Sequence, residues 1–396
     1  MTADASQPAR RVVDTRHPQD TTAILAHAAD QAQHRNLVDY LIVDADCHHY
    51  ENDSIEEIIA LIDDPIVKRM AEHRRGSLIG ISIADQDLSG RILSGTAARR
   101  GEAGESGKPR DVVLARRAMA AMGIDYSILF PSPMLVLGIH PQVDVEVAIA
   151  RAYARWMTEK ILPADSSIKS LLYLPFNRPD ACLRMVEEFG DRPGVIGFLM
   201  TSVRYRAIHD DAYLPLYAEL ERRELPLGIH GSHNWNDRAF ELLNRFISVH
   251  ALAFPFYSMI HMTNWVINGM PERFPGLKLV WIEGGLAYVP YLMQRLDHEF
   301  MMRSSEAPLL KRLPSDYMRD FYYTSQPLEV GVHDLTPLKT TFEMINAESQ
   351  LLFASDYPHW DFDLPSRIFD LPFLTDHARR RILGQNAHDL FKLDRR

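Results

Sequence analysis

The sequence predicts an α/β fold, a (β/α)8 TIM barrel in which a ring of parallel strands is surrounded by helices. From residue 111 onward, helical stretches alternate with short apolar runs. Together with the run that begins at residue 41, these runs predict about eight strands. Most of the runs end in polar residues. The second candidate fold, an open doubly wound sheet, lacks the G-x-G-x-x-G fingerprint that it would need after its first strand.

Outside the repeating part, the chain has an N-terminal arm and one insertion. Residues 1–40 are polar, with a short helix expected over 21–35, and this arm is expected to add little to the core. It would either reach a neighbouring subunit or be mobile. Residues 41–396 form a single barrel domain with a lid-like insertion at about 52–110. The insertion is helical over 54–75 and then rich in Gly, Ser, Arg and Glu, which is typical of a lid, a binding segment or disorder.

The remaining elements follow in strict alternation. Strands are expected at residues 41–48, 126–130, 170–174, 194–200, 226–230, 278–282, 321–323 and 351–354, each identified by a short apolar run. Helices are expected at residues 111–122, 142–162, 179–189, 211–223, 238–268, 288–302 and 338–346.

Composition excludes several classes of function. The formal net charge of −10 argues against a nucleic-acid or anionic-membrane surface, which requires clustered Lys and Arg. The two cysteines, Cys47 and Cys182, are too few for a disulfide framework and suit a reducing cytoplasm. No apolar stretch approaches the length of about 20 residues that a spanning helix needs. A small molecule is therefore the expected partner.

The stretch LIVDADCHHYE at residues 41–51 places several ionisable groups at the end of an apolar strand. Asp44, Asp46 and His48 recur at spacing two, so in a regular strand their side chains would share one side. His49 and Glu51 follow directly. Burying this many carboxylates and imidazoles is costly unless a divalent cation compensates their charges. The stretch is thus interpreted as half of a metal site.

Other strand ends supply the second half of this site. Catalytic groups of such barrels gather where the strands end. The fifth strand ends in His230, the sixth is followed by Glu283, and the eighth is followed by Asp356. Together with Asp46 and His48 these residues offer two imidazoles and several carboxylates, which suit Zn²⁺, Mn²⁺ or Fe²⁺.

The segments VDADCHHYE, GIHGSH, RFPGLKLVWIEGG and LLFASDYPHWD resemble, in the same order, the amidohydrolase-related family of metal-dependent enzymes. This family includes decarboxylases of resorcylate-type acids. The resemblance implies that Asp46, His48, His230 and Asp356 hold the metal, and that Glu283 is catalytic or supports a ligand. It implies decarboxylation or hydrolysis of a small organic acid.

The number of metal ions stays open at this stage. The fourth strand ends in FLMTS, without the lysine that bridges two metals in many hydrolases of the superfamily. His49, His261 and Glu283 are nevertheless candidate ligands of a second ion. The alternative function is a dinuclear iron or manganese monooxygenase that hydroxylates a small amino or organic acid, and such enzymes are similar to this sequence as well.

Roles can be assigned to the other polar residues near these motifs. Asp356 or Glu283 would transfer a proton, and His230 or His233 would orient the reacting group. Substrate carboxylate would be bound by a set of candidate residues, namely Arg204, Arg206 and His359, with Arg91 of the insertion as a further candidate. A non-catalytic subunit of a homo- or hetero-oligomer, joined through the N-terminal arm, is the lesser alternative.

Overall fold

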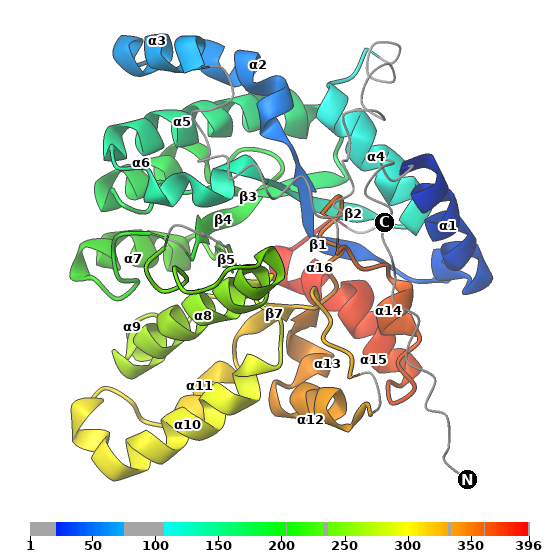
Figure 1. Ribbon diagram of the computed structural model, residues 1–396, viewed down its shortest axis with the longest axis vertical. Helices are drawn as coiled ribbons and strands as arrows, with labels where there is room; N and C mark the ends of the chain where they lie inside the picture. Colours follow the sequence, from blue (N-terminus) through cyan, green and yellow to red (C-terminus); the bar gives the residue numbers. More distant parts are fainter. Residues whose placement is uncertain are drawn as a thin grey trace.

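The computed structural model describes residues 21–74, 107–202, 204–232, 237–331, 334–359 and 361–394. Within these ranges, eight strands form one sheet in the order β1 to β8, and every neighbouring pair is parallel. Figure 1 shows helices arranged around these strands. Ala45 N donates to Phe353 O over 2.9 Å, which joins the first strand to the segment after the last. The predicted barrel is confirmed.

The strands are β1 (Val43–His49), β2 (Tyr126–Pro131), β3 (Ile168–Tyr173), β4 (Val195–Thr201), β5 (Leu227–His230), β6 (Leu279–Ile282), β7 (Tyr322–Thr324) and β8 (Leu351–Leu352). The helices are α1 (Thr21–His34), α2 (Ile55–Ala60), α3 (Pro65–Arg74), α4 (Arg110–Met122), α5 (Val143–Trp156), α6 (Pro179–Phe189), α7 (Leu214–Arg222), α8 (Phe246–Ile267), α9 (Met270–Arg273), α10 (Tyr288–Arg303), α11 (Pro314–Met318), α12 (Thr336–Met344), α13 (Ala347–Gln350), α14 (Ser366–Phe369), α15 (Asp376–Arg380) and α16 (Asn386–Phe391).

Some expected helices differ from the observed ones, and proline and glycine explain two of the boundaries. The helix expected over residues 54–75 is divided into α2 and α3, because Pro65 begins a new helix and disfavours helical backbone in the residue before it. Helix α4 ends as expected, since Gly123 adopts a left-handed φ of 73° at its C-terminus. The helix expected over residues 238–268 begins only at Phe246.

The inside of the barrel is filled by a small apolar cluster. It includes Val43 and Ala45 of β1, Leu171 of β3 and Ile282 of β6, together with side chains of α16. Gly228 of β5 is part of this close packing: a Cβ there would lie 2.9 Å from Ile282 Cδ1 and 3.0 Å from Leu171 Cδ1. A larger residue would therefore force these side chains apart, since the interior is packed at crystal-like density.

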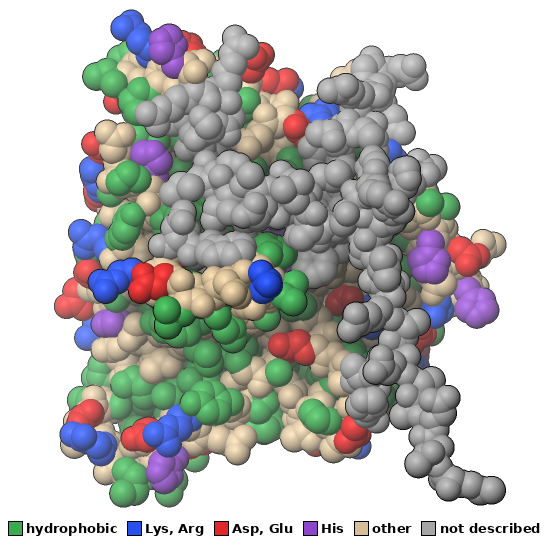
Figure 2. Space-filling view, in the orientation of Figure 1, with side chains coloured by type: hydrophobic (Ala, Val, Ile, Leu, Met, Phe, Trp, Pro, Cys, Tyr) green, Lys and Arg blue, Asp and Glu red, His purple; other side chains and the backbone are tan. Residues whose placement is uncertain are grey.

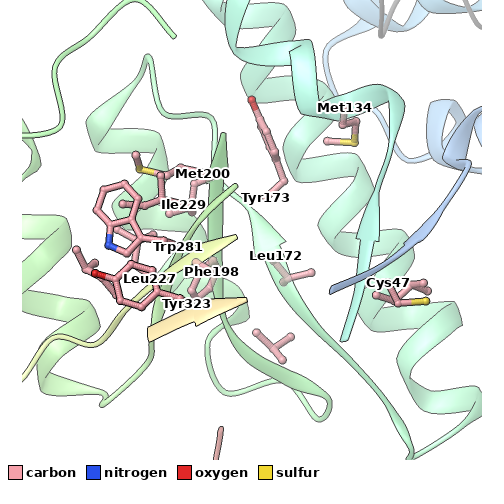
Figure 3. Packing of buried hydrophobic residues seen from close by; sticks show 14 of the residues in the cluster. Cys47, Met134, Leu172, Tyr173, Phe198, Met200, Leu227, Ile229, Trp281 and Tyr323 are labelled. Carbon is pink, nitrogen blue, oxygen red and sulfur yellow. The ribbon is translucent and has the colours of Figure 1, made fainter. Parts of the chain in front are cut away.

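A second and larger apolar cluster lies between the strands and the surrounding helices. Figure 3 shows part of it, with Phe198 and Met200 of β4, Leu227 and Ile229 of β5 and Trp281 of β6 gathered on neighbouring strands. Helix α1 joins the same cluster through Leu25 and Ala28, which are buried, and α1 packs on α4. The described part of the arm, residues 21–40, thus contributes to the core of its own chain, contrary to the expectation from its polar sequence.

The outer surface includes exposed apolar side chains of α8. This helix contains no Asp, Glu, Lys or Arg, and three of its side chains, Ile247, Leu252 and Ile260, are exposed. Figure 2 shows hydrophobic side chains gathered in this region. Even so, in the described ranges no helix is both long enough and apolar enough to cross a membrane.

Strand β1 departs from a regular alternation at the point where the site begins. Its register against β2 shifts between Asp44 and Cys47, which is a β-bulge. Val43 and Ala45 lie in the apolar cluster inside the barrel, and the side chain of Asp44, between them in the strand, lies on the other side. Its carboxylate accepts hydrogen bonds from Ser355 N (2.8 Å) and Ser355 Oγ (2.5 Å). The expectation that Asp44 shares a side with Asp46 and His48 is therefore wrong, because the bulge reverses the alternation.

Candidate metal site

The site begins with Asp46 and His48 at the end of β1. Both are buried, and the Asp46 Oδ1 atom lies 3.0 Å from His48 Nε2. His230, the last residue of β5, faces them from across the barrel, with its Nε2 atom 3.5 Å from Asp46 Oδ1. The Phe130 ring of β2 contacts both imidazoles edge-on, at centroid distances of 6.0 Å and 5.8 Å. Three potential ligands therefore converge above an apolar floor.

Backbone carbonyls fix the orientation of both imidazoles. His48 Nδ1 lies 3.2 Å from Pro131 O, and His230 Nδ1 lies 2.5 Å from Gly231 O. Since a carbonyl oxygen only accepts, Nδ1 of each ring carries a proton, and in the neutral ring Nε2 presents a lone pair. The two Nε2 atoms are 3.2 Å apart. Two lone pairs at this distance, next to a carboxylate, are favourable only when a cation lies among them.

Glu283 and Asp356 complete the rim from β6 and β8. Glu283 Oε2 lies 3.5 Å from His230 Nε2, and Asp356 Oδ1 lies 3.3 Å from His48 Nε2. Both residues have positive φ angles, 52° and 59°, which cost about 1–3 kcal/mol each in a residue other than glycine. Hydrogen bonds hold this backbone: Glu283 N donates to Thr324 Oγ1 over 3.0 Å, and Asp356 N donates to Asp46 O over 2.8 Å.

The carboxylates have strongly altered acidity. Burial disfavours the charge on Asp46, but the adjacent His230 and His48 rings outweigh burial and lower its pKa to about 2. Burial, followed by the Glu283 and Asp46 carboxylates, raises the pKa of Asp356 well above its ordinary value. Burial also lowers the pKa of His48. Such a site favours a neutral His48 imidazole beside at least one ionised carboxylate, and these are donors that divalent metals prefer.

The donor atoms fit a metal ion. Asp46, His48, His230 and Glu283 each offer one atom, and these atoms all lie within 4.8 Å of one another. His48, Glu283, Asp356 and His359 form an overlapping group by the same measure. Both carboxylate oxygens of Asp46, as well as Asp356 Oδ2, are buried without a hydrogen-bond partner among the described residues. Buried carboxylate oxygens of this kind are normally paired or bound to a metal.

His359 lies beside the site and contacts it through Asp356. Its Nδ1 atom is 2.7 Å from Asp356 Oδ1, its Nε2 atom is 3.1 Å from Ser132 Oγ, and its ring lies 4.3 Å from that of His48. Sequence reasoning did not identify Ser132. Its position directly after β2, at the same rim, was the available signal.

His49 does not join the cluster. Its Nδ1 atom lies 2.9 Å from Asp111 Oδ1, and its Nε2 atom lies 2.8 Å from Tyr153 Oη. The ring stacks on Trp156 at a centroid distance of 5.6 Å and an interplanar angle of 11°. Because His49 alternates with His48 on β1, it packs toward α4 and α5 outside the barrel, and both of its nitrogens are used there.

His261 and Arg204 form a separate pair near the end of β4. His261 Nε2 donates to Ser202 O over 2.6 Å, and its Nδ1 accepts from the Arg204 guanidinium over 3.1 Å. Burial, followed by the Arg204 charge, lowers the pKa of His261 well below its ordinary value. Burial likewise lowers the pKa of Arg204, to about 10. Neither group of candidate metal ligands in the described ranges contains His261.

The other predicted substrate-binding residues are spread more widely. Arg204 lies over the Phe176 ring, 4.8 Å from its centroid, and also donates to Thr201 O. Arg206 is exposed and pairs with Asp210 at 3.2 Å. His233, predicted as a catalytic residue, and Arg91 of the insertion both lie outside the described residues.

Comparison with known proteins identifies the family. The amidohydrolase family model matches residues 43–393, which includes every strand and the whole cluster. The chain belongs to the amidohydrolase family. This amidohydrolase is 23% identical over 269 residues to gamma-resorcylate decarboxylase of Rhodococcus jostii (strain RHA1), a match that covers 64% of this chain and 80% of that protein.

Solved structures with the same fold include enzymes that act on aromatic acids. The structure of 5-carboxyvanillate decarboxylase from Sphingomonas paucimobilis matches with a TM-score of 0.65 and 20% identity, covering 90% of this amidohydrolase and 100% of that chain. A dihydroxybenzoic acid decarboxylase from Polaromonas sp. JS666, with bound manganese and the inhibitor 2-nitroresorcinol, matches with a TM-score of 0.61 and 18% identity. The match covers 90% of this amidohydrolase and 98% of that chain. At this identity the likeness establishes the fold.

Proposed function

We propose that this amidohydrolase is a manganese-dependent decarboxylase of hydroxylated aromatic carboxylic acids. The observation that carries the proposal is the convergence of His48 Nε2, His230 Nε2 and the Asp46 carboxylate on one point at the barrel rim. The decarboxylase names of its relatives support the reaction class, and the manganese in the Polaromonas structure supports the ion.

Asp46, His48, His230 and Glu283 would hold one divalent ion. This assignment differs from the sequence-based set by including Glu283 and releasing Asp356, because the first four residues form one group of donor atoms within 4.8 Å. When bound, the ion supplies Lewis-acid polarisation of oxygen atoms on the substrate. The carbonyls of Pro131 and Gly231 keep both imidazoles in the protonation form that presents Nε2 to the ion.

Asp356 would transfer the proton that the reaction consumes. Loss of CO2 breaks the bond between the carboxylate carbon and the ring, and the electron pair stays on the ring carbon, which must then take up one proton. Asp356 Oδ2 is buried and without a partner in the described part of the chain, so it is placed to deliver that proton. His233 is retained as a residue that orients the substrate, and Arg204 and Arg206 as residues that bind its carboxylate. His359, predicted as a third carboxylate-binding residue, is instead assigned to hold Asp356, because its two ring nitrogens are bonded to Asp356 and Ser132.

A dinuclear oxygenase is the second candidate function. The observation that favours it is the overlapping group of His48, Glu283, Asp356 and His359, which could hold a second ion. Two ions per chain, with iron among them and dioxygen uptake in the presence of a small amino acid, would establish it. A cytoplasmic location and assembly through the N-terminal arm stay predictions.

The test is an assay with two probe acids, 2,6-dihydroxybenzoate and 5-carboxyvanillate, on protein reconstituted with manganese. We expect release of CO2 and of the corresponding phenol, loss of turnover after chelation, and recovery on addition of manganese. The matched control is Ser170→Ala, which removes a hydroxyl bonded to Leu129 O at 2.8 Å and affects neither group of candidate metal ligands. Absence of CO2 release from both acids by the manganese-loaded protein would refute the proposal for this substrate class.

A further inference from the structure

Both ring nitrogens of His359 have hydrogen-bond partners. Nδ1 lies 2.7 Å from Asp356 Oδ1, and Nε2 lies 3.1 Å from Ser132 Oγ. Asp356 accepts at Oδ1 both when it is ionised and when its proton is on Oδ2, the oxygen without a partner in the described part of the chain. Nδ1 of His359 then carries the proton, and Nε2 accepts from the Ser132 hydroxyl. In this arrangement His359 has no nitrogen lone pair left for a metal ion. Its hydrogen bond to the site is therefore the one to Asp356.

Ser132 is itself held in place from the end of β1. Its backbone N–H donates to Glu51 Oε2 over 3.0 Å and lies 3.1 Å from His49 O. The other oxygen of Glu51 accepts from Met134 N over 2.6 Å, at the start of the short helix η4 (Pro133–Ile139). Glu51 is fully buried, so these two bonds are shielded from water and define where the hydroxyl of Ser132 lies.

We infer that Ser132 is a positioning residue, which fixes the ring orientation and the tautomer of His359 and thereby the orientation of the Asp356 carboxylate. The start of η4 does not require a hydroxyl at residue 132, because the backbone N–H of this residue, and not its side chain, makes the bonds to Glu51 and His49. The hydroxyl of Ser132 is used toward His359. This inference rests on the proposed function for its effect on turnover, whereas the effect on His359 itself does not depend on the reaction.

The decisive variants are Ser132→Ala, which removes the hydroxyl, and Ser132→Thr, which restores it. With the manganese-loaded enzyme and 2,6-dihydroxybenzoate, we expect Ser132→Ala to lower kcat by roughly 10-fold, the effect typical of removing a partner that orients a site residue. KM and manganese content should stay unchanged, and Ser132→Thr should recover most of the loss. Ser170→Ala, the control defined above, should leave kcat unchanged.

A double-mutant cycle separates positioning from a general structural role. If Ser132 acts through His359, then Ser132→Ala should add no further loss of kcat in a His359→Gln background. Additive losses in the double variant would overturn the inference, and so would an unchanged kcat in Ser132→Ala or a failure of Ser132→Thr to recover activity.

The tautomer of His359 provides a readout without turnover. In ¹⁵N NMR of the metal-free protein, with the His359 signal assigned from its absence in His359→Gln, we expect the Nδ1–H form. Ser132→Ala should shift this signal toward a mixture of tautomers, and Ser132→Thr should restore it. An unchanged signal in Ser132→Ala would overturn the inference. If the wild-type protein releases no CO2 from the probe acids, the proposed function fails, and this signal still decides the role of Ser132.

Discussion

The Nε2 atoms of His48 and His230 lie 3.2 Å apart, and the Nδ1 atom of each ring donates to a backbone carbonyl. Neutral imidazoles in this arrangement direct two lone pairs at each other, and Asp46 Oδ1 lies 3.0 Å from one of them. Without a cation these three groups repel one another. The folded protein should therefore bind a divalent ion tightly and be stabilised by it.

Removal of the ion should lower the thermal stability. A ligand present at about 1,000 times its Kd stabilises the folded state by about 4 kcal/mol, so chelation should lower Tm by several degrees, and added manganese should restore it. Scanning calorimetry with and without manganese measures this shift. His48→Gln should abolish the shift, whereas His377→Gln, at a side chain that is 69% exposed, should retain it. Equal Tm values with and without manganese would contradict the assignment of the site.

Substitution should distinguish the role of Asp356 as proton donor from that of Glu283 as metal ligand. Asp356→Asn should lower kcat by about 100-fold or more, as expected for loss of a proton donor, while one manganese per chain is retained. Glu283→Gln should instead lower the manganese content, because it weakens a ligand. Elemental analysis beside steady-state kinetics gives both quantities. The opposite pattern, in which Asp356→Asn loses the ion and Glu283→Gln keeps it, would return Asp356 to the ligand set that the sequence suggested.

The barrel and the convergence of the rim residues could be predicted because both follow from local patterns. Parallel strands end at one rim, so a polar residue directly after an apolar run, such as His230 or Asp356, is placed there by the fold alone. The orientation of the Asp44 side chain could not be predicted from the local sequence, since the bulge in β1 depends on pairing with β2. A regular alternation was the only guide available from the sequence.

The partners of the predicted residues were beyond the reach of sequence reasoning. His49 forms hydrogen bonds with Asp111 on α4 and Tyr153 on α5, and His359 forms one with Ser132, 227 residues away in the sequence. These contacts arise from helix packing and from closure of the ring, neither of which leaves a local signal. The choice between Glu283 and Asp356 as a ligand depends on differences of a few tenths of an ångström between donor-atom distances. The spacing of residues in the sequence does not determine such differences.

His49 should be important for stability and unimportant for the metal content. His49→Gln leaves part of the buried Asp111 and Tyr153 pair unsatisfied, at a cost of about 1–3 kcal/mol in the free energy of unfolding. Urea denaturation measures the loss, and elemental analysis should still give one manganese per chain. A fall from two ions to one in this variant would instead support His49 as a ligand of a second metal.

A buried carboxyl that belongs to neither group of candidate metal ligands should make stability depend on pH. Burial raises the pKa of Glu146 from 4.5 to about 7, against the hydrogen bonds from Asn177 (3.0 Å) and Tyr173 (3.2 Å). The folded protein thus keeps a proton that the unfolded chain releases near pH 4.5. Between these two values the free energy of unfolding falls as pH rises, by up to about 1.4 kcal/mol per pH unit from this group.

Glu146→Gln, which stays neutral at every pH, should remove this dependence. We expect the variant to match the wild type in urea denaturation at pH 4.5 and to exceed its stability at pH 8, where the wild type carries the buried charge in full. Glu187→Gln, at an exposed position on α6, should follow the wild-type curve throughout. If Glu146→Gln and the wild type lose stability in parallel between these pH values, another group is responsible for the slope, and Glu146 is ionised at a lower pH than its burial indicates.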